Sequence, residues 1–115
     1  MVINDMFSLK FKKNNMGTMS KTFDRAYGAR FYDYNTAITL YNQEIEKFNP
    51  ENFAAWHNRG VCKIHKAILE QDLELAIDGK VDIMNAIDLA KDDYPMADDN
   101  IKWADDIILK LKSKL

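Results

Sequence analysis

Three side chains near the middle of the chain, those of His57, Cys62 and His65, are of types that bind metal ions or act as nucleophiles. Cys62 and His65 are three residues apart and would share one face of a helix, whereas His57 is five residues from Cys62 and would point elsewhere. Zinc takes about four ligands in a closed set, and the chain has no second cysteine. We therefore expect no metal site and no cofactor, and we expect Cys62 to be a small buried apolar residue.

Carboxylates are the other abundant polar groups, and a dense set of them lies on both sides of Pro95. These residues are Asp92, Asp93, Asp98, Asp99, Asp105 and Asp106. They contain no calcium-loop pattern with its glycine, and the chain contains no GxSxG, P-loop, HExxH or Ser/His/Asp pattern. We predict no catalytic residues and a chain that is not an enzyme. The acids are expected to form a solvated face, or a surface that mimics the charge of nucleic acid.

The elements that must position these side chains are predicted to be helices. The chain has 115 residues, enough for one domain, with only four glycines and two prolines and with 30% charged residues. Residues 70–106 contain twelve acids and three lysines, a net charge of −9, which would repel nucleic acid. A single cysteine fits a reducing compartment, so we expect a cytoplasmic protein. No uncharged apolar run approaches the roughly 18 residues of a membrane span.

Apolar residues at helical spacing predict an all-α fold of five helices in antiparallel hairpins over residues 20–115. The first helix begins after Ser20. The second is capped by Asp33 and ends at Asn49, because a residue before proline is pushed out of helical geometry. The third covers about residues 51–69, the fourth follows a cap at Asp72, and the fifth starts near Ala97. The predicted core face of the fourth helix is Leu73, Ala76, Ile77, Val81, Met84, Ile87 and Ala90.

Residues 1–19 are predicted to be a separate N-terminal extension, either strand-like or disordered. Phe7, Leu9 and Phe11 alternate with polar residues, and this two-residue period over a short run is typical of a strand. A lone strand leaves unpaired backbone groups that another chain can satisfy. We therefore expect that the chain can form a homo-oligomer.

Gly60 and Trp56 are predicted to organise the central helix hairpin. They lie on one face of the third helix with Phe53 and Ile64. A glycine inside a helix costs roughly 1 kcal/mol against alanine, so it usually marks the close approach of another backbone. We expect the helix ending at Phe48 to pack against Gly60, with Trp56 buried beside the contact.

The stretch from Asn49 to Gly60, NPENFAAWHNRG, resembles a junction between two tetratricopeptide repeats, with a closing proline followed by the next repeat's Trp and Gly. The run DYNTAI from Asp33 to Ile38 resembles the start of a repeat's second helix. The distance from Gly28 to Gly60 is 32 residues, near the roughly 34 of this repeat. The resemblance covers about residues 20–115 and implies two repeats followed by a solvating final helix.

The sequence departs from the tetratricopeptide pattern in three places. The link between Phe31 and Asp33 is short, about one extra residue precedes Pro50, and an insertion around residues 66–80 lengthens the helices of the second repeat. A generic helical bundle is the alternative fold.

The tetratricopeptide resemblance implies a function in protein binding. The family mostly binds peptides or protein segments in a concave groove lined by the first helices of its repeats, so we predict a non-catalytic adaptor or scaffold. The residues implied for the groove here are Arg25, Ala29, His57, Asn58, Val61 and His65. The alternative function is an acidic decoy or inhibitor that occupies the basic surface of a partner through residues 70–106. The final tripeptide, Ser113 to Leu115, matches a peroxisomal address, so a peroxisomal location is the alternative to the cytoplasm.

Overall fold

Five α-helices and one π-helical turn make up the regular structure of residues 21–30, 33–91, 94 and 96–115, which are the residues that the computed structural model describes. In chain order the elements are α2 (Lys21–Ala29), α3 (Tyr34–Gln43), η2 (Glu44–Phe48), α4 (Phe53–Glu70), α5 (Leu73–Ala90) and α6 (Ala97–Lys112). The prediction of an all-α fold of about five helices in hairpins is confirmed. The predicted N-terminal extension lies outside the described residues and stays a prediction. No described helix is both long and apolar enough to cross a membrane.

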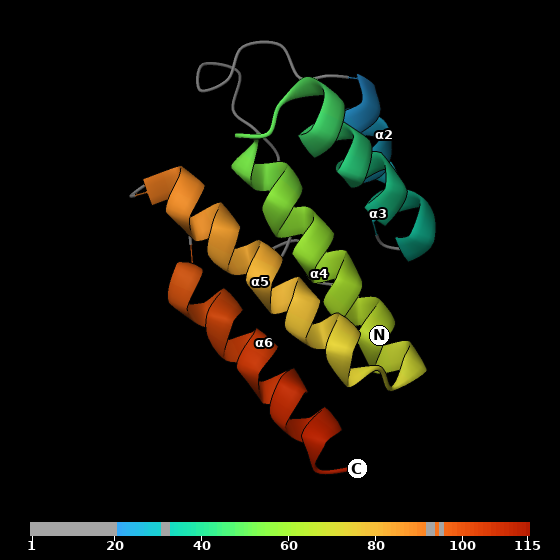
Figure 1. The fold of residues 1–115 in the computed structure, drawn as a ribbon, viewed down its shortest axis with the longest axis vertical. Coiled ribbons are helices and arrows are strands. Elements are labelled where there is room, and N and C mark those ends of the chain that lie inside the picture. The colour runs from blue at the N-terminus through green and yellow to red at the C-terminus, as the bar shows by residue number, and fades with distance from the viewer. Residues whose placement is uncertain (1–20, 31–32, 92–93, 95) are drawn as a thin grey trace.

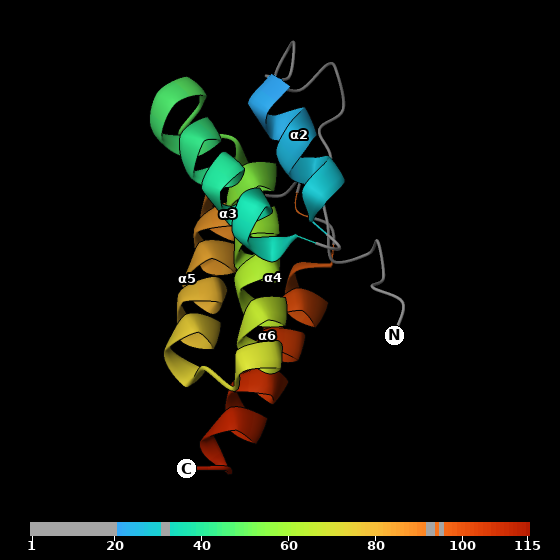
Figure 2. The ribbon, with the colours of Figure 1, turned by 90° about the vertical axis from the view of Figure 1, so that its right-hand side faces the viewer.

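Helices α4 and α5 form the central hairpin, and the other helices pack on either side of it (Figure 1). Helices α2 and α3 form a second hairpin, of which α3 packs on α4. Helix α6 runs along α5 and also contacts α4 (Figure 2). Neighbouring helices therefore cover several sides of α4, and this is why several of its polar residues are buried.

The core has a large apolar cluster on each side of α4, and a smaller third cluster of Ala67, Ala76 and Leu111 lies where the ends of α4 and α6 meet the start of α5. One large cluster joins α2, α3 and the start of α4, and Phe23 and Tyr41 are its largest buried side chains. The other large cluster joins α4, α5 and α6 around Ile64, Ile83 and Ala104. Trp56 is half-buried and packs against both clusters, so it lies at the boundary between the two hairpins.

Gly60 packs against α5, so the prediction that it faces the helix ending at Phe48 is wrong. A Cβ atom on Gly60 would lie 2.4 Å from the carbonyl oxygen of Gly79, and one on Gly79 would lie 2.6 Å from the carbonyl oxygen of Gly60. Because neither glycine has a side chain, the backbones of α4 and α5 come into close contact at this crossing. Trp56 is outside this contact, and its indole N–H donates to the carbonyl oxygen of Pro50 at 2.8 Å.

A short polar side chain caps the N-terminus of three helices, and two of these caps are predicted from the sequence. Asp33 accepts the backbone N–H of Thr36 at 3.0 Å, and Asp72 accepts that of Leu75 at 3.1 Å, so both predicted caps are confirmed. Asn52, which was not predicted as a cap, accepts the N–H of Ala55 at 3.0 Å and begins α4.

The second predicted helix ends in the π-helical turn η2, directly before Pro50. The N–H of Asn49 donates to the carbonyl oxygen of Glu44, five residues earlier, at 2.7 Å. Such a turn holds one residue more per hydrogen bond than an α-helical turn, and it lies where the sequence carries one residue more than the repeat pattern. The Glu44 side chain is buried and accepts the Asn52 amide at 2.8 Å, so this turn is tied to the start of α4.

The buried face of α5 differs from the predicted one. Ala76 and Ala90 are buried as predicted, whereas Val81 and Met84 are each 49% exposed. The actual core face is the stripe of Ala76, Gly79, Ile83, Ala86 and Ala90. Small residues on this stripe let α4 approach closely, so the larger apolar residues are left on the outer side.

Candidate functional site

Four of the five residues predicted to bind a partner are buried, so the prediction that they line an open groove is wrong for these four. His57, Asn58, Val61 and His65 are buried on α4, and only Arg25, on α2, is exposed. Ala29, which was also expected in the groove, is buried in the α2–α3 cluster. The physical reason is that α3, α5 and α6 all contact α4 and cover the faces that carry these side chains.

His65 lies between two aromatic rings from different helices. It stacks on Tyr34 of α3 with ring centroids 5.7 Å apart and an angle of 15°, and its centroid is 5.1 Å from that of Trp103 of α6. Burial lowers the pKa of His65 to about 4, because the charged imidazolium would lose its hydration there. The ring is therefore neutral at physiological pH and acts as a packing element between α3 and α6.

His57 takes part in a second buried polar contact. Its Nδ1 atom hydrogen-bonds with the hydroxyl of Tyr94, and the two rings meet edge to face with centroids 5.2 Å apart. Burial raises the pKa of Tyr94, and the nearby side chain of Asn100 on α6, whose amide makes no hydrogen bond among the described residues, opposes part of that rise. Because all three side chains are buried, this cluster joins α4 to the start of α6.

Asn58 and Cys62 point toward the α2–α3 hairpin. Burial raises the pKa of Tyr41 on α3, whose hydroxyl has no hydrogen-bond partner among the described residues, and the nearby Asn58 side chain opposes the rise. Burial also raises the pKa of the Cys62 thiol to about 12, and its Sγ atom donates to the carbonyl oxygen of Arg30 at 3.7 Å. A buried thiol of this kind is a poor nucleophile. The described residues contain no group of three metal-ligating side chains.

A buried carboxylate connects the central hairpin to α3. Asp82 of α5 accepts two hydrogen bonds from Arg59, at 2.8 Å each, and forms an ion pair with Lys63 at 3.0 Å. Both basic residues lie on α4. Arg59 also donates to Asn42 of α3 at 2.8 Å, and its guanidinium lies 4.8 Å from the centre of the Trp56 ring. This bidentate geometry fixes the orientation of the Arg59 and Asp82 side chains. The network is satisfied within the chain, and its geometry serves to hold three helices together.

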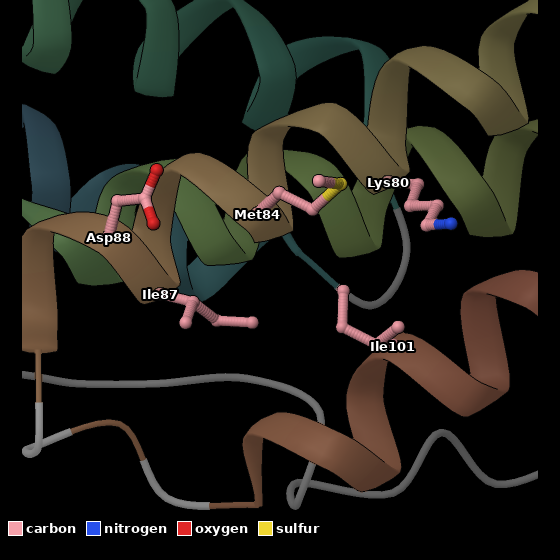
Figure 3. A pocket seen from close by; sticks show the side chains of 5 residues that line it. All are labelled: Lys80, Met84, Ile87, Asp88 and Ile101. Carbon is pink, nitrogen blue, oxygen red and sulfur yellow. The ribbon is translucent and has the colours of Figure 1, made fainter.

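An apolar groove between α5 and α6 is a further feature of the described residues that could bind a ligand. It has a volume of about 290 Å³, and Figure 3 shows Ile87 of α5 and Ile101 of α6 across from one another, with Met84 beside them. Ile87 and Ile101 also pack against the core cluster of α4, α5 and α6, so they form the floor of the groove. Met84 is half-exposed at its edge, and Val81, one helical turn earlier on α5, is equally exposed.

Charged residues border this apolar floor. Lys80 and Asp88 line the groove on the α5 side, one turn to either side of Met84 (Figure 3). The Lys80 ammonium binds the Asp105 carboxylate of α6 at 2.6 Å, so its charge is paired across the groove. Asp98 is exposed on α6, three residues before Ile101 and on the same helix face.

Sequence reasoning missed this groove because its apolar residues were assigned to the core. Met84 and Ile87 were placed on the buried face of the fourth predicted helix, and Ile101 is apolar in the same way. The signal that could have found the groove is the stripe of small residues that contains Gly79. That stripe predicts a close helix contact and leaves Val81 and Met84 on the opposite side.

Comparisons with known proteins identify no relative. No family model matches the chain, and neither a curated protein nor a solved structure matches it significantly. The resemblance to tetratricopeptide repeats therefore stays a prediction.

Proposed function

We propose that this chain is a non-catalytic helical module that binds a polypeptide partner through the groove between α5 and α6. The observation that carries the proposal is the groove itself, in which the half-exposed side chain of Met84 borders a floor formed by Ile87 and Ile101. Exposed apolar groups that gather around a depression usually mark an interaction site. Grooves of this type commonly take the apolar side chains of a partner helix or peptide.

The tetratricopeptide relationship belongs to the same proposal. Two successive hairpins, α2–α3 and α4–α5, followed by the single helix α6, follow the element order expected of two repeats and a solvating final helix. The proposed binding surface nevertheless differs from the one that the family implies, because α4 is covered on the side that carries His57 and His65. The proposed role is still that of an adaptor or scaffold, but the proposed binding surface lies on α5 and α6.

The acidic decoy is the weaker candidate. Exposed acids do lie on α6, but Asp105 binds Lys80 and Asp106 binds Lys102 at 3.0 Å. These internal pairs reduce the charge that is left for a basic partner surface. The apolar floor of the groove would also have no role in a decoy that works through charge.

Site-specific photo-crosslinking tests the proposed function. A photoreactive phenylalanine analogue is placed at Val81, beside the groove, or at Arg25, which is exposed on α2 and was the accessible member of the predicted groove. After irradiation in an extract of the native source, we expect discrete crosslinked polypeptides from position 81 and none of the same species from position 25. Crosslinks from position 25 alone, or from neither position, would contradict the proposal.

A further inference from the structure

The shape of the α5–α6 groove narrows the kind of ligand that it can take. Its volume of about 290 Å³ lies at the lower end of the roughly 300–1,000 Å³ of small-molecule sites. A space of this size on the outside of two neighbouring helices suits one or two apolar side chains that project from a larger partner. The two helices also present parallel ridges, against which a third helix can pack.

The charges around the groove select among such partners. Asp88 lines the groove, and Asp98 lies one helical turn before Ile101, whereas the lining cation Lys80 is already paired with Asp105. The net local field is therefore negative. Anionic membrane surfaces and nucleic acids are repelled by such a field, while lysine and arginine side chains on a polypeptide are attracted.

We propose that the occupant of the α5–α6 groove is a basic amphipathic helix of a partner protein. Apolar side chains at helical spacing enter the groove above Ile87 and Ile101, and lysine or arginine side chains on the flanks of the same helix face Asp88 and Asp98. This inference deepens the proposed function and rests on it, because it names the chemistry of the polypeptide that the groove binds.

Three designed peptides test this inference by fluorescence anisotropy with the full chain. The first has leucines at positions i, i+3, i+4 and i+7 and lysines on the flanks. The second replaces every lysine by glutamate, and the third keeps the composition of the first but scrambles the leucine spacing. We expect the first to bind at least about tenfold more tightly than either of the others, and its affinity to fall as salt is raised from about 0.05 to 0.3 M.

Variants of the protein place the binding at the groove. Asp88→Lys combined with Asp98→Lys is expected to weaken the binding of the basic peptide by about tenfold or more, because both charges beside the groove then repel its lysines. Asp24→Lys combined with Glu46→Lys is the matched control, since both acids are exposed, on α2 and η2, and carry the same total change of charge away from the groove. It is expected to change the affinity by less than about twofold. Met84→Ser is expected to weaken binding of the peptide as well, because it removes apolar contact at the edge of the groove without changing the charge there.

Several results would overturn the inference. Equal binding of the basic and acidic peptides would do so, as would absence of binding by the basic peptide. Self-association of the chain that Met84→Ser removes would also overturn it, since the groove would then bind a second copy. In each case crosslinking at Val81 reports separately on the proposed function. Crosslinks to another polypeptide would leave protein binding at the groove intact while the basic-helix inference fails.

Discussion

His65 is a histidine whose neutrality is required by its position. Its ring is only 7% exposed and lies between Tyr34 and Trp103, and its Nε2 atom has no hydrogen-bond partner among the described residues. Protonation would place a charge between two aromatic rings without water to hydrate it. The cost of that charge appears as the lowered pKa of His65, about 4 instead of 6.5.

We predict that His65 makes the protein less stable as the pH falls from about 6.5 to 4. The unfolded chain binds a proton at His65 in this range and the folded chain does not, so its contribution is complete above pH 6.5 and is lost toward pH 4. The two pKa values imply a loss on the order of 3 kcal/mol. His65→Phe keeps the aromatic packing and removes the imidazole that binds the proton.

Chemical denaturation at several pH values measures this contribution. Acidic side chains also titrate below about pH 5, so the quantity to compare is the difference in unfolding free energy between the parent chain and His65→Phe. That difference should shift in favour of the variant as the pH falls. A constant difference across the range would show that His65 is accessible to protons in the folded state.

At the scale of the elements, the contact between Gly60 and Gly79 sets how closely α4 and α5 approach. Each glycine would place a Cβ atom less than 3 Å from the backbone of the other helix. Gly28 of α2 is the opposite case, because a Cβ atom there would meet nothing within 4 Å. The chain therefore contains glycines that packing requires and one that it does not.

We predict that Gly60→Ala destabilises the protein by about 1–3 kcal/mol, because the new methyl group forces α4 and α5 apart. Gly28→Ala is expected to stabilise it by up to about 1 kcal/mol, since alanine favours the helix and nothing obstructs its side chain. Thermal unfolding of both variants measures the two effects with the same substitution. If Gly60→Ala also stabilised the protein, the close crossing of α4 and α5 would be refuted.

The helices could be predicted from the sequence because their signals are local. Asp33 and Asp72 cap the next helix through an N–H group three residues away, and Asn49 ends a helix because proline follows it. The partner of Gly60 could not be predicted in this way. A glycine indicates that something comes close, but the identity of the neighbouring helix depends on the packing of the whole chain.

The candidate site could not be predicted from the sequence for a related reason. Helix α5 carries apolar residues on two faces, and periodicity alone does not tell which face is buried. Val81 and Met84 are large and apolar, but the small residues opposite them take the contact with α4. Similarly, His57 is polar yet buried, because Tyr94 supplies a hydrogen-bond partner from a distant part of the chain.

At the scale of the whole molecule, Asp82 holds together helices from both hairpins. Its carboxylate is buried and forms ion pairs with both Arg59 and Lys63, while Arg59 extends the network to Asn42 of α3. The two apolar clusters are otherwise separate and meet at Trp56. The ion network thus adds a polar connection where the two halves of the core join.

We predict that Asp82→Ala destabilises the protein by about 3 kcal/mol, at the lower end of the range for breaking a buried ion pair, because the two cations stay in place without their carboxylate. The matched control is Asp106→Ala, which removes a 3.0 Å pair with Lys102 whose side chains are 53% and 75% exposed. That substitution should cost less than about 1 kcal/mol. Hydrogen exchange extends the comparison, since loss of Asp82 should lower the protection of α3 as well as that of α4 and α5. If protection fell in α5 alone, the network would not couple the two hairpins, and Trp56 with its apolar neighbours would be left as their connection.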